Sequence, residues 1–516
     1  MVKAGSLSNR DADIDRSTAL ESLRQFLGAR LLTGRSVREQ HCHTTTIIAS
    51  QPPDAVTFPQ NANEVSDIVK ICAQHRMPVI GYGTGTSLEG HVNAPWGGVA
   101  VDFSEMNRVL AINQEDLDCV IEPGVTRRAL NRELRDTGLF FAIDPGADAS
   151  LGGMAATRAS GTNAVRYGTI RENVLALKAV MADGSMISTG RRARKSAAGY
   201  DLTHLMVGSE GTLGLITELT LRLHGIPETI CSARCSFVSV HDACQAVIDI
   251  IQLGVPVARI ELLDELTVRA VNEYSQLSLP ETPLLLLEFH GSSSGVEEQA
   301  NSCGDIFNDH GGSQFQQSVN PEERNRLWRA RHDTYWAQLR LREGAKAIAT
   351  DACVPISCLA ECVVRAQQQA QKLGILAPIV GHVGDGNFHM ALLIDPDNQV
   401  EMNQATHFIE WLAELAVDLG GTCTGEHGIG QGKMSSLRKE TGNAYNWMGR
   451  IKRAFDPHNI MNPGKLVDLS GLSQQVTIDP SEIASTGQCG DSEATDRYIE
   501  ARREVGDAKI SRDTGR

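Results

Sequence analysis

The sequence predicts an α+β protein with more than one domain. A chain of 516 residues is too long for one compact core, and its length favours two to four domains. Two regions, approximately 55–223 and 228–420, alternate short apolar strands with amphipathic helices. The scale of this alternation in the second region favours helices packed on an antiparallel sheet. Pro227 marks the first clear boundary between the two regions.

Composition and charge exclude several classes of protein. The formal net charge of -15 argues against a general nucleic-acid binder, because neutralising phosphates requires a positive surface. The twelve cysteines include no Cys-x-x-Cys pair, so most are expected to be buried as small apolar side chains. The first fifteen residues lack an apolar core and carry three aspartates, which argues against a secretory signal and a mitochondrial presequence. No apolar run approaches the roughly 18 residues needed to span a bilayer. We therefore expect a cytoplasmic protein, with peripheral attachment at the inner membrane face as the alternative.

The first half is expected to hold an N-terminal helical segment, 1–50, and a first domain, 51–226. Apolar spacing over 17–40 predicts one or two helices in the segment. Within the domain we assign helices to Val65–His75 and Arg127–Thr137, and strands to Pro78–Ile80, Gly98–Phe103 and Cys119–Ile121.

The second domain is expected to span 227–420. Its expected helices are His241–Leu253, Pro321–Leu341, Ile356–Leu373 and Asn403–Leu419, and its expected strands are Leu284–Phe289, Ala347–Asp351 and Met390–Ile394. The segment 421–467 is glycine-rich and then helical, and we expect it to carry an active-site loop and to return to the first domain. Residues 468–516 shift to Ser, Asp, Glu, Gly and Arg, which predicts a poorly ordered tail.

Three glycine-rich segments in the first domain indicate a bound ligand. The first, Gly81–Gly90, follows an expected strand, and its backbone N–H groups with Thr and Ser hydroxyls could surround a phosphate. A nicotinamide-binding fingerprint would have to open a helix, whereas this loop continues into another strand. Alone, the loop could equally be a surface turn. The further glycine-rich stretches at 144–169 and 208–217 favour instead a long ligand lying against the backbone.

Two histidines flank the dipeptide Asp385-Gly386 in the stretch GHVGDGNFH. Asp-Gly is the preferred core of a two-residue hairpin turn. Such a hairpin would place His382 opposite His389 on one sheet face, with Cβ atoms about 5 Å apart. Two imidazoles in this position can chelate one metal ion, and the alternative is a solvated pair of histidines at a hairpin end.

Glu426 and His427 lie in the glycine-flanked stretch TGEHGIG. The glycines leave the backbone free to turn both side chains into a cleft. Glu426 with the two histidines would form an incomplete shell with open positions, as a catalytic metal requires. His427 is then left over, and it is the natural proton acceptor near neutral pH if it points towards the substrate.

The first domain resembles the FAD-binding domain of the vanillyl-alcohol-oxidase-like flavoproteins. The resemblance is carried, in order, by PDAV-FPQ, GTGTSLEG, DPGA–SLGG–A–SG–RYGT and GSEGTLGLITE, over approximately 52–223. It implies an FAD-binding domain of two subdomains followed by an α+β substrate (cap) domain. Thr86 occupies the place where some relatives carry a flavin-tethering histidine, so non-covalent FAD is expected. The residues implied to bind FAD are Gly83, Thr84, Gly85, Thr86, Ser87, Gly90, Pro145, Gly146, Ser150, Gly152, Gly153, Gly161, Tyr167, Gly168, Thr169, Gly211 and Ile216.

The second half resembles the C-terminal domain of the FAD-linked D-lactate, D-2-hydroxyglutarate and glycolate dehydrogenases. The matching stretches are GHVGDGNFH, GEHGIG and FDPHNIMNPGKL. Within this family, the cytochrome-linked D-lactate group is the most similar, and that similarity is carried by GTGTSLEG, RKSAAGYDLTHL and TDACVPIS. The resemblance implies a divalent metal, Zn or Mn, bound by His382, His389 and Glu426, with His427 as the base. It also implies that Arg331 grips the substrate carboxylate, with Arg329 as a close rival.

These features together predict the oxidation of a small D-2-hydroxy acid, D-lactate above all, to the 2-oxo acid. Hydride would pass to the flavin and electrons to a cytochrome, such as cytochrome c, or to a quinone. Thr350 stands where relatives acting on dicarboxylates place a lysine, so recognition of a second carboxylate by Lys346 is the weaker alternative. The rival functions are a glycolate oxidase catalytic subunit, a D-2-hydroxyglutarate dehydrogenase, a flavin-binding sensor and a flavin-free oxygenase with a two-histidine-one-carboxylate metal. The oligomeric state is not predicted.

Overall fold

The computed structural model describes residues 14–470, and its first sheet has four strands in the order β1-β2-β4-β3. Three run parallel, and β1 is antiparallel to β2. Two helices pack their apolar side chains onto this sheet in one buried cluster, which also takes in Val180 and Leu215 from the next sheet. These elements are α1 (Arg16–Leu27), β1 (Leu31–Leu32), α2 (Arg35–Gln40), β2 (Ala55–Thr57), α3 (Ala62–Gln74), β3 (Val79–Tyr82) and β4 (Val99–Asp102).

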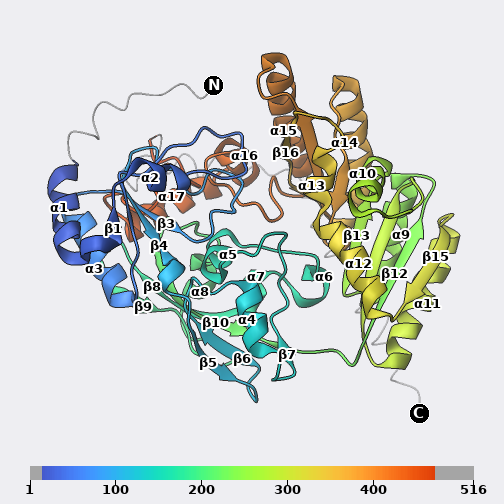
Figure 1. The fold of residues 1–516 in the computed structure, drawn as a ribbon, viewed down its shortest axis with the longest axis horizontal. Helices are drawn as coiled ribbons and strands as arrows, with labels where there is room; N and C mark the ends of the chain where they lie inside the picture. Colours follow the sequence, from blue (N-terminus) through green and yellow to red (C-terminus); the bar gives the residue numbers. More distant parts are fainter. Residues whose placement is uncertain (1–13, 471–516) are drawn as a thin grey trace, which may run out of the picture. The chain divides into compact units, whose positions relative to one another are not determined.

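The second sheet is antiparallel and has five strands in the order β5-β6-β10-β8-β9 (Figure 1). Its strands are β5 (Val109–Asn113), β6 (Asp118–Ile121), β8 (Val174–Val180), β9 (Met186–Ser188) and β10 (Leu215–Arg222). The helices associated with it are short, and a small pair of strands, β7 (Leu139–Phe140) and β11 (His224–Gly225), lies beside them. These helices are α4 (Arg127–Leu134), α5 (Leu151–Thr157), α6 (Ala164–Tyr167), α7 (Ile170–Asn173) and α8 (Leu202–Met206). The two sheets confirm the expected pair of subdomains.

A third, entirely antiparallel sheet forms the second half, in the order β15-β12-β14-β13-β18-β19-β16, with β17 also paired to β19. Its strands are β12 (Thr229–Ser236), β13 (Arg259–Leu263), β14 (Leu284–Gly291), β15 (Ser313–Ser318), β16 (Lys346–Ala349), β17 (Ala352–Cys353), β18 (Ile379–Gly381) and β19 (Asn387–Ile394). The α+β cap domain with an antiparallel sheet is thereby confirmed.

Helices cover both faces of this third sheet, which explains why β14 reads as a continuous apolar run. Leu285 and Leu287 pack against α9, α11, α14 and α15, whereas Leu284 and Leu286 pack against α10, α12 and α13. The predicted helix Pro321–Leu341 is divided at Asp333 into two helices. The helices are α9 (Val240–Gln252), α10 (Glu265–Ser275), α11 (Ser293–Asp309), α12 (Pro321–His332), α13 (Thr334–Leu339), α14 (Leu359–Leu373) and α15 (Gln399–Asp418).

The chain after α15 returns to the first sheet through a glycine-rich loop and the helices α16 (Met434–Thr441) and α17 (Ala444–Phe455), drawn in red in Figure 1. The N–H of Val79 on β3 donates to the carbonyl of Ile460 at 2.8 Å. Lys452 on α17 donates from its Nζ to the carbonyl of Thr212 at 2.7 Å. The expected tail lies outside the described residues beyond 470.

The hairpin predicted around Asp385-Gly386 is wrong in register. Val380 pairs with His389, two positions away from the predicted partner His382. The chain instead makes a single 3₁₀ turn at Val383–Asp385, and Gly386 then takes a φ of 74°. Contact with β17 is the physical reason, because the N–H of Val354 donates to the carbonyl of Gly386 at 3.0 Å and fixes the loop. A shift of two residues in the strand pairing leaves each side chain on the same face of the sheet. His382 and His389 therefore still point towards each other.

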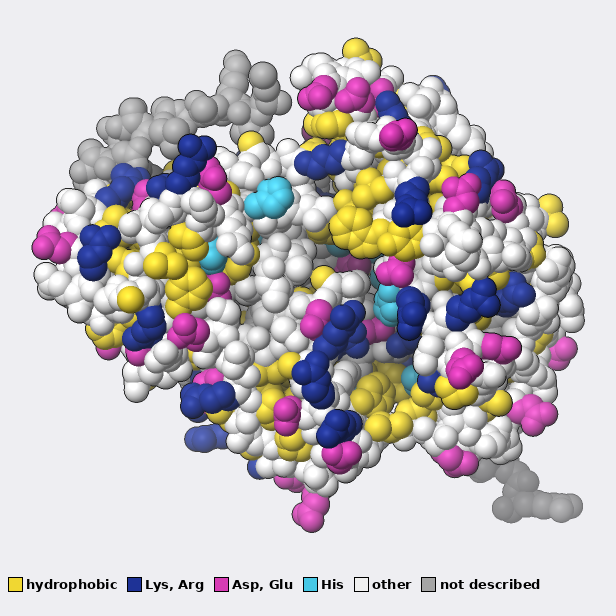
Figure 2. Space-filling model, in the orientation of Figure 1, with side chains coloured by type: hydrophobic (Ala, Val, Ile, Leu, Met, Phe, Trp, Pro, Cys, Tyr) yellow, Lys and Arg dark blue, Asp and Glu magenta, His cyan; other side chains and the backbone are white. Residues whose placement is uncertain are grey.

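Surface and cysteine patterns agree with the composition. All eleven cysteines in the described part of the chain are free thiols, and nine of them are buried. No helix within residues 14–470 is long and apolar enough to cross a membrane. Basic and acidic side chains are interspersed on the face drawn in Figure 2, so the negative net charge does not gather in one patch there.

Candidate active site

The structure brings His382, His389 and Glu426 together from three segments. His382 follows β18, His389 lies on β19, and Glu426 lies in the loop after α15. Glu426 Oε1 is 3.6 Å from His382 Nε2 and 3.2 Å from His389 Nε2. One potential ligand atom from each of the three residues lies within 4.8 Å of the others. This spacing suits a single divalent cation with two imidazoles and one carboxylate.

Hydrogen bonds fix both imidazoles so that each Nε2 faces Glu426. His382 Nδ1 donates to Glu261 Oε1 at 2.7 Å, and His389 Nδ1 donates to the carbonyl of Thr350 at 2.9 Å. Metal-binding histidines are usually oriented by such bonds to a carboxylate or a carbonyl. His389 Nε2 is buried and has no hydrogen-bond partner. The orphaned nitrogen and the orienting bonds show that these residues fit a divalent metal.

The charges of this cluster also favour a cation. Burial alone would lower the pKa of His382, but the carboxylates of Glu261 and Glu426 outweigh it and hold this pKa well above its ordinary value. Burial would likewise raise the pKa of Glu426, yet His382 and His389 hold it well below its usual range. A buried pair of carboxylates therefore requires positive charge at this point.

His427 stacks on His389, with ring centroids 4.9 Å apart and planes 7° from parallel. Its Nε2 is 3.9 Å from Glu426 Oε1, and its Nδ1 is buried without a hydrogen-bond partner. Burial lowers the pKa of His427 to about 4. The imidazole is therefore neutral at pH 7 and has a nitrogen available to accept a proton.

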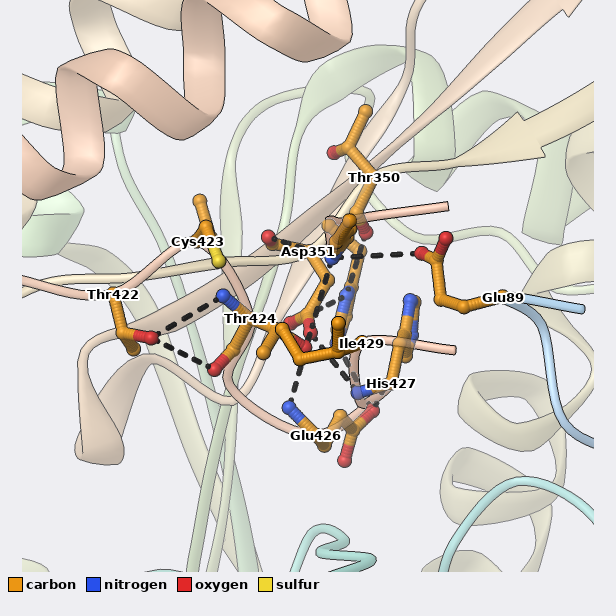
Figure 3. Close-up of polar contacts among 12 residues, drawn as sticks. Glu89, Thr350, Asp351, Thr422, Cys423, Thr424, Glu426, His427 and Ile429 are labelled. Atoms are coloured by element: carbon orange, nitrogen blue, oxygen red, sulfur yellow. Dashed lines mark hydrogen bonds and ion pairs between the residues drawn. The ribbon is translucent and has the colours of Figure 1, made fainter. Parts of the chain in front are cut away.

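The buried carboxylate of Asp351 positions the backbone that carries Glu426 and His427 (Figure 3). Its Oδ2 accepts from the N–H groups of Glu426 and His427, both at 3.0 Å, and from Thr424 Oγ1 at 2.6 Å. Burial would raise the pKa of Asp351, but the nearby Lys433 and the hydrogen bond from Thr424 hold it well below its usual range. Asp351 is therefore an ionised acceptor for this loop.

Arg331 does not face the cluster as a free cation. Its Nε donates to Glu261 Oε2 at 2.7 Å, and its NH1 donates to Thr334 Oγ1 at 3.2 Å. Glu261 thus joins Arg331 to His382, because β13 turns Glu261 to the sheet face that α12 covers. Arg329 is exposed on the opposite side of α12. The predicted grip of Arg331 on a substrate carboxylate stays a prediction.

The two positions considered for a second substrate carboxylate are both occupied. Lys346 Nζ donates to the carbonyl of Thr46 at 2.7 Å. Thr350 Oγ1 accepts from the N–H of Met390 at 2.9 Å. Each side chain therefore already makes one hydrogen bond within the protein.

The predicted flavin residues of the first loop meet the start of α5. A Cβ at Gly83 would overlap the hydroxyl of Ser150, and a Cβ at Gly85, whose φ is 66°, would overlap the ring of Tyr82. Ser87 and Ser150 carry buried hydroxyls without hydrogen-bond partners. Close backbone packing and orphaned hydroxyls are what a phosphate-bearing ligand requires, so these residues fit FAD. Thr84 and Thr86 are exposed at this loop.

The other predicted flavin residues have diverse surroundings. The hydroxyl of Tyr167 forms a hydrogen bond of 2.7 Å with His290 Nδ1 on β14. This bond connects the first half of the chain to the cap domain. Positions Gly168 and Gly211 have positive φ, Thr169 caps α7, and Ile216 is buried in the apolar core. Pro145 is half-buried, and a Cβ at Gly146 would meet no atom. At four further glycines of this set, a Cβ atom would overlap a neighbouring residue. The overlapping pairs are Gly90 with Gln431, Gly152 with Pro123, Gly153 with Ser150 and Gly161 with Asp144.

Sequence reasoning missed Glu261, Asp351 and Glu210, which all accept hydrogen bonds in or around the site. Glu261 had a visible signal, because it is an acid in the middle of the apolar strand RIELL, where burial demands a partner. Asp351 and Glu210 had no comparable signal, because their partners are backbone groups distant in sequence.

Comparisons with known proteins agree with this architecture. Residues 53–190 match the FAD binding domain family, and residues 226–466 match the C-terminal domain of FAD linked oxidases. The probable mitochondrial D-lactate dehydrogenase of Danio rerio is 51% identical over 468 residues, which cover 90% of this chain and 94% of that protein. The mitochondrial D-lactate dehydrogenase (cytochrome) of Arabidopsis thaliana is 46% identical over 416 residues, which cover 80% of this chain and 73% of that protein.

Among solved structures, p-cresol methylhydroxylase with substrate bound has a TM-score of 0.75 at 17% identity, covering 89% of this chain and 98% of that one. Identity this low shows a shared fold and nothing more.

Proposed function

The chain belongs to the family of FAD-linked oxidases, and on that premise we propose that it is an FAD-dependent dehydrogenase oxidising a small D-2-hydroxy acid, D-lactate above all, to the 2-oxo acid. The observation that carries the proposal is the neutral imidazole of His427 stacked beside the His382–His389–Glu426 cluster. The relatives whose names specify D-lactate dehydrogenase support the choice of substrate.

Two bound groups would supply chemistry that side chains cannot. The loops around Gly83 and Ser150 would hold FAD, which would supply a hydride acceptor and a route for electrons to a cytochrome or quinone. His382, His389 and Glu426 would hold a divalent ion, which would supply Lewis-acid polarisation of the substrate's hydroxyl. Non-covalent attachment of the flavin and the identity of the ion, Zn or Mn, are parts of the proposal.

The chain's own residues orient the substrate and hold the proton. His427 accepts the hydroxyl proton at the imidazole nitrogen that is free of hydrogen bonds. Glu261 fixes the ring of His382 with Nε2 directed at Glu426, and Arg331 balances the charge of Glu261. Asp351 keeps His427 beside the cluster by accepting its backbone N–H.

We expect the purified chain to reduce a dye acceptor with D-lactate and to leave L-lactate at background. Only one enantiomer can direct its Cα hydrogen at the flavin while its hydroxyl faces His427 and its carboxylate is bound. Initial rates with D-lactate, L-lactate, glycolate and D-2-hydroxyglutarate measure this directly. Preference for L-lactate contradicts the proposal, and preference for glycolate or D-2-hydroxyglutarate replaces the substrate while keeping the reaction.

The cellular location also stays a proposal. We infer a cytoplasmic protein from the composition of the chain, although the D-lactate dehydrogenases of Danio rerio and Arabidopsis thaliana carry the word mitochondrial in their names. Cell fractionation with an antibody against the chain decides between the two compartments.

A further inference from the structure

The loop that carries Glu426 and His427 is held from both halves of the chain. Asp351, between β16 and β17 in the cap domain, accepts the N–H groups of Glu426 and His427. Glu210, from the FAD-binding half, accepts the N–H of Ile429 through Oε1 at 2.7 Å and that of Gly430 through Oε2 at 2.8 Å. Four backbone N–H groups within five residues of the loop therefore donate to two buried carboxylates.

The two glycines that follow His427 are explained by this contact. Gly428 has a φ of 78°, and a Cβ there would lie 2.9 Å from Glu210 Oε1 and 2.8 Å from His91 Nε2. Gly430 has a φ of 47°, and a Cβ there would strike the carbonyl of Glu89. The spacing in GEHGIG thus lets the backbone lie directly against Glu210 and Glu89, which an L side chain at either position would prevent.

Glu210 itself adopts a backbone conformation that favours glycine. Its φ is 55°, and its N–H donates to the carbonyl of Ala156 on α5 at 2.8 Å. A non-glycine residue in this region costs of the order of 1–3 kcal/mol and persists only where the surroundings impose it. Glu210 is 6% exposed, so little solvent is available to replace the N–H groups of the loop around its carboxylate.

We propose that Glu210 and Asp351 form a carboxylate clamp, one member from each half of the chain, that positions the loop 424–430 and with it Glu426 and His427. Both are positioning residues, because each acts on the loop's backbone. The proposal deepens the function proposed above and rests on it for the roles of Glu426 and His427. The position of the loop itself does not depend on that function.

Hydrogen exchange of the loop's backbone amides tests the clamp without any substrate. In the wild-type FAD-loaded protein, the amides of Glu426, His427, Ile429 and Gly430 are expected to exchange slowly, because each donates to a buried carboxylate. Fast exchange of Ile429 and Gly430 in the wild type overturns the proposal, even if no variant folds.

Glu210→Gln is the sharper test. A carboxamide keeps one accepting oxygen and turns an NH2 group towards the second N–H, so exchange around Ile429 and Gly430 is expected to accelerate. Misplacing a catalytic group by ~1 Å costs about 10²-fold in rate, so flavin reduction by D-lactate is expected to slow strongly while FAD and metal content are kept. Asp351→Ala, which removes the one oxygen that accepts both N–H groups, is expected to act likewise on Glu426 and His427.

The matched control is Glu122→Gln, which alters a buried carboxylate beside β5 and β6 that also accepts a backbone N–H, from Arg108 at 2.9 Å. It is expected to leave exchange of the loop and flavin reduction unchanged. Unchanged exchange in Glu210→Gln overturns the clamp, and faster exchange with unchanged flavin reduction overturns its positioning role. Should the wild type not be reduced by D-lactate at all, the proposed function fails while the exchange data still decide on the clamp.

Discussion

Replacing His427 by alanine is expected to slow flavin reduction by about 10²–10⁴-fold, the usual cost of removing a general base. The imidazole is neutral at pH 7 and is stacked on His389, beside the proposed metal ligands. FAD and metal should both be retained, because His427 belongs neither to the three glycine-rich segments of the first domain nor to the proposed ligand set. Rapid-mixing measurement of flavin bleaching by D-lactate, together with metal analysis, provides the test.

The control for this variant is His310→Ala, a half-exposed histidine on the cap domain paired with Asp249. It should bleach at the wild-type rate. Wild-type bleaching by His427→Ala would show that His427 is not the base. Loss of metal from His427→Ala would make His427 a ligand instead.

Replacing His382 by alanine is expected to abolish metal binding and activity together while FAD is kept. His382 supplies one of the three ligand atoms around Glu426 Oε1, and its loss also leaves the buried Glu261 with Arg331 as its only charged partner. Loss of a metal ligand commonly has a larger effect than loss of the histidine's orienting partner, which typically costs 10–100-fold. Metal content by elemental analysis and FAD content by absorbance distinguish this outcome from unfolding.

A matched variant, Glu261→Gln, separates ligand loss from orientation. The carboxamide can still accept from His382 Nδ1, so metal should be bound more weakly but not lost. Equal metal loss in both variants would place Glu261 among the ligands. Full retention of metal in His382→Ala would contradict the ligand set.

The sequence alone allowed His382, His389 and Glu426 to be placed together because each stands in a short motif with its own local chemistry. His382 and His389 flank a turn, and Glu426 is freed by glycines, so local patterns were enough to group these three residues. The turn itself was predicted wrongly, since Asp-Gly prefers a two-residue hairpin but the hydrogen bond from Val354 imposes a longer loop. The histidines still met, because the two-residue shift left their side chains on the same face.

What could not be predicted depends on contacts between distant residues. Glu210 lies 219 positions from Ile429, and Asp351 lies 75 from Glu426, so no local pattern connects them. The role expected for Arg331 stays a prediction, and its pairing with Glu261 depends on how β13 and α12 meet. Tertiary packing of this kind determines which side of a helix faces the active site, and helical periodicity alone does not.

Anaerobic mixing of the FAD- and metal-loaded protein with D-lactate, in the absence of any acceptor, tests the central claim most directly. The flavin should lose its yellow absorbance in a single turnover, with one pyruvate formed per flavin, and L-lactate should leave the colour unchanged. Removal of the metal by a chelator should stop the bleaching, and adding back Mn²⁺ or Zn²⁺ should restore it. Bleaching that is equally fast without metal, or flavin that D-lactate leaves oxidised, would contradict the account.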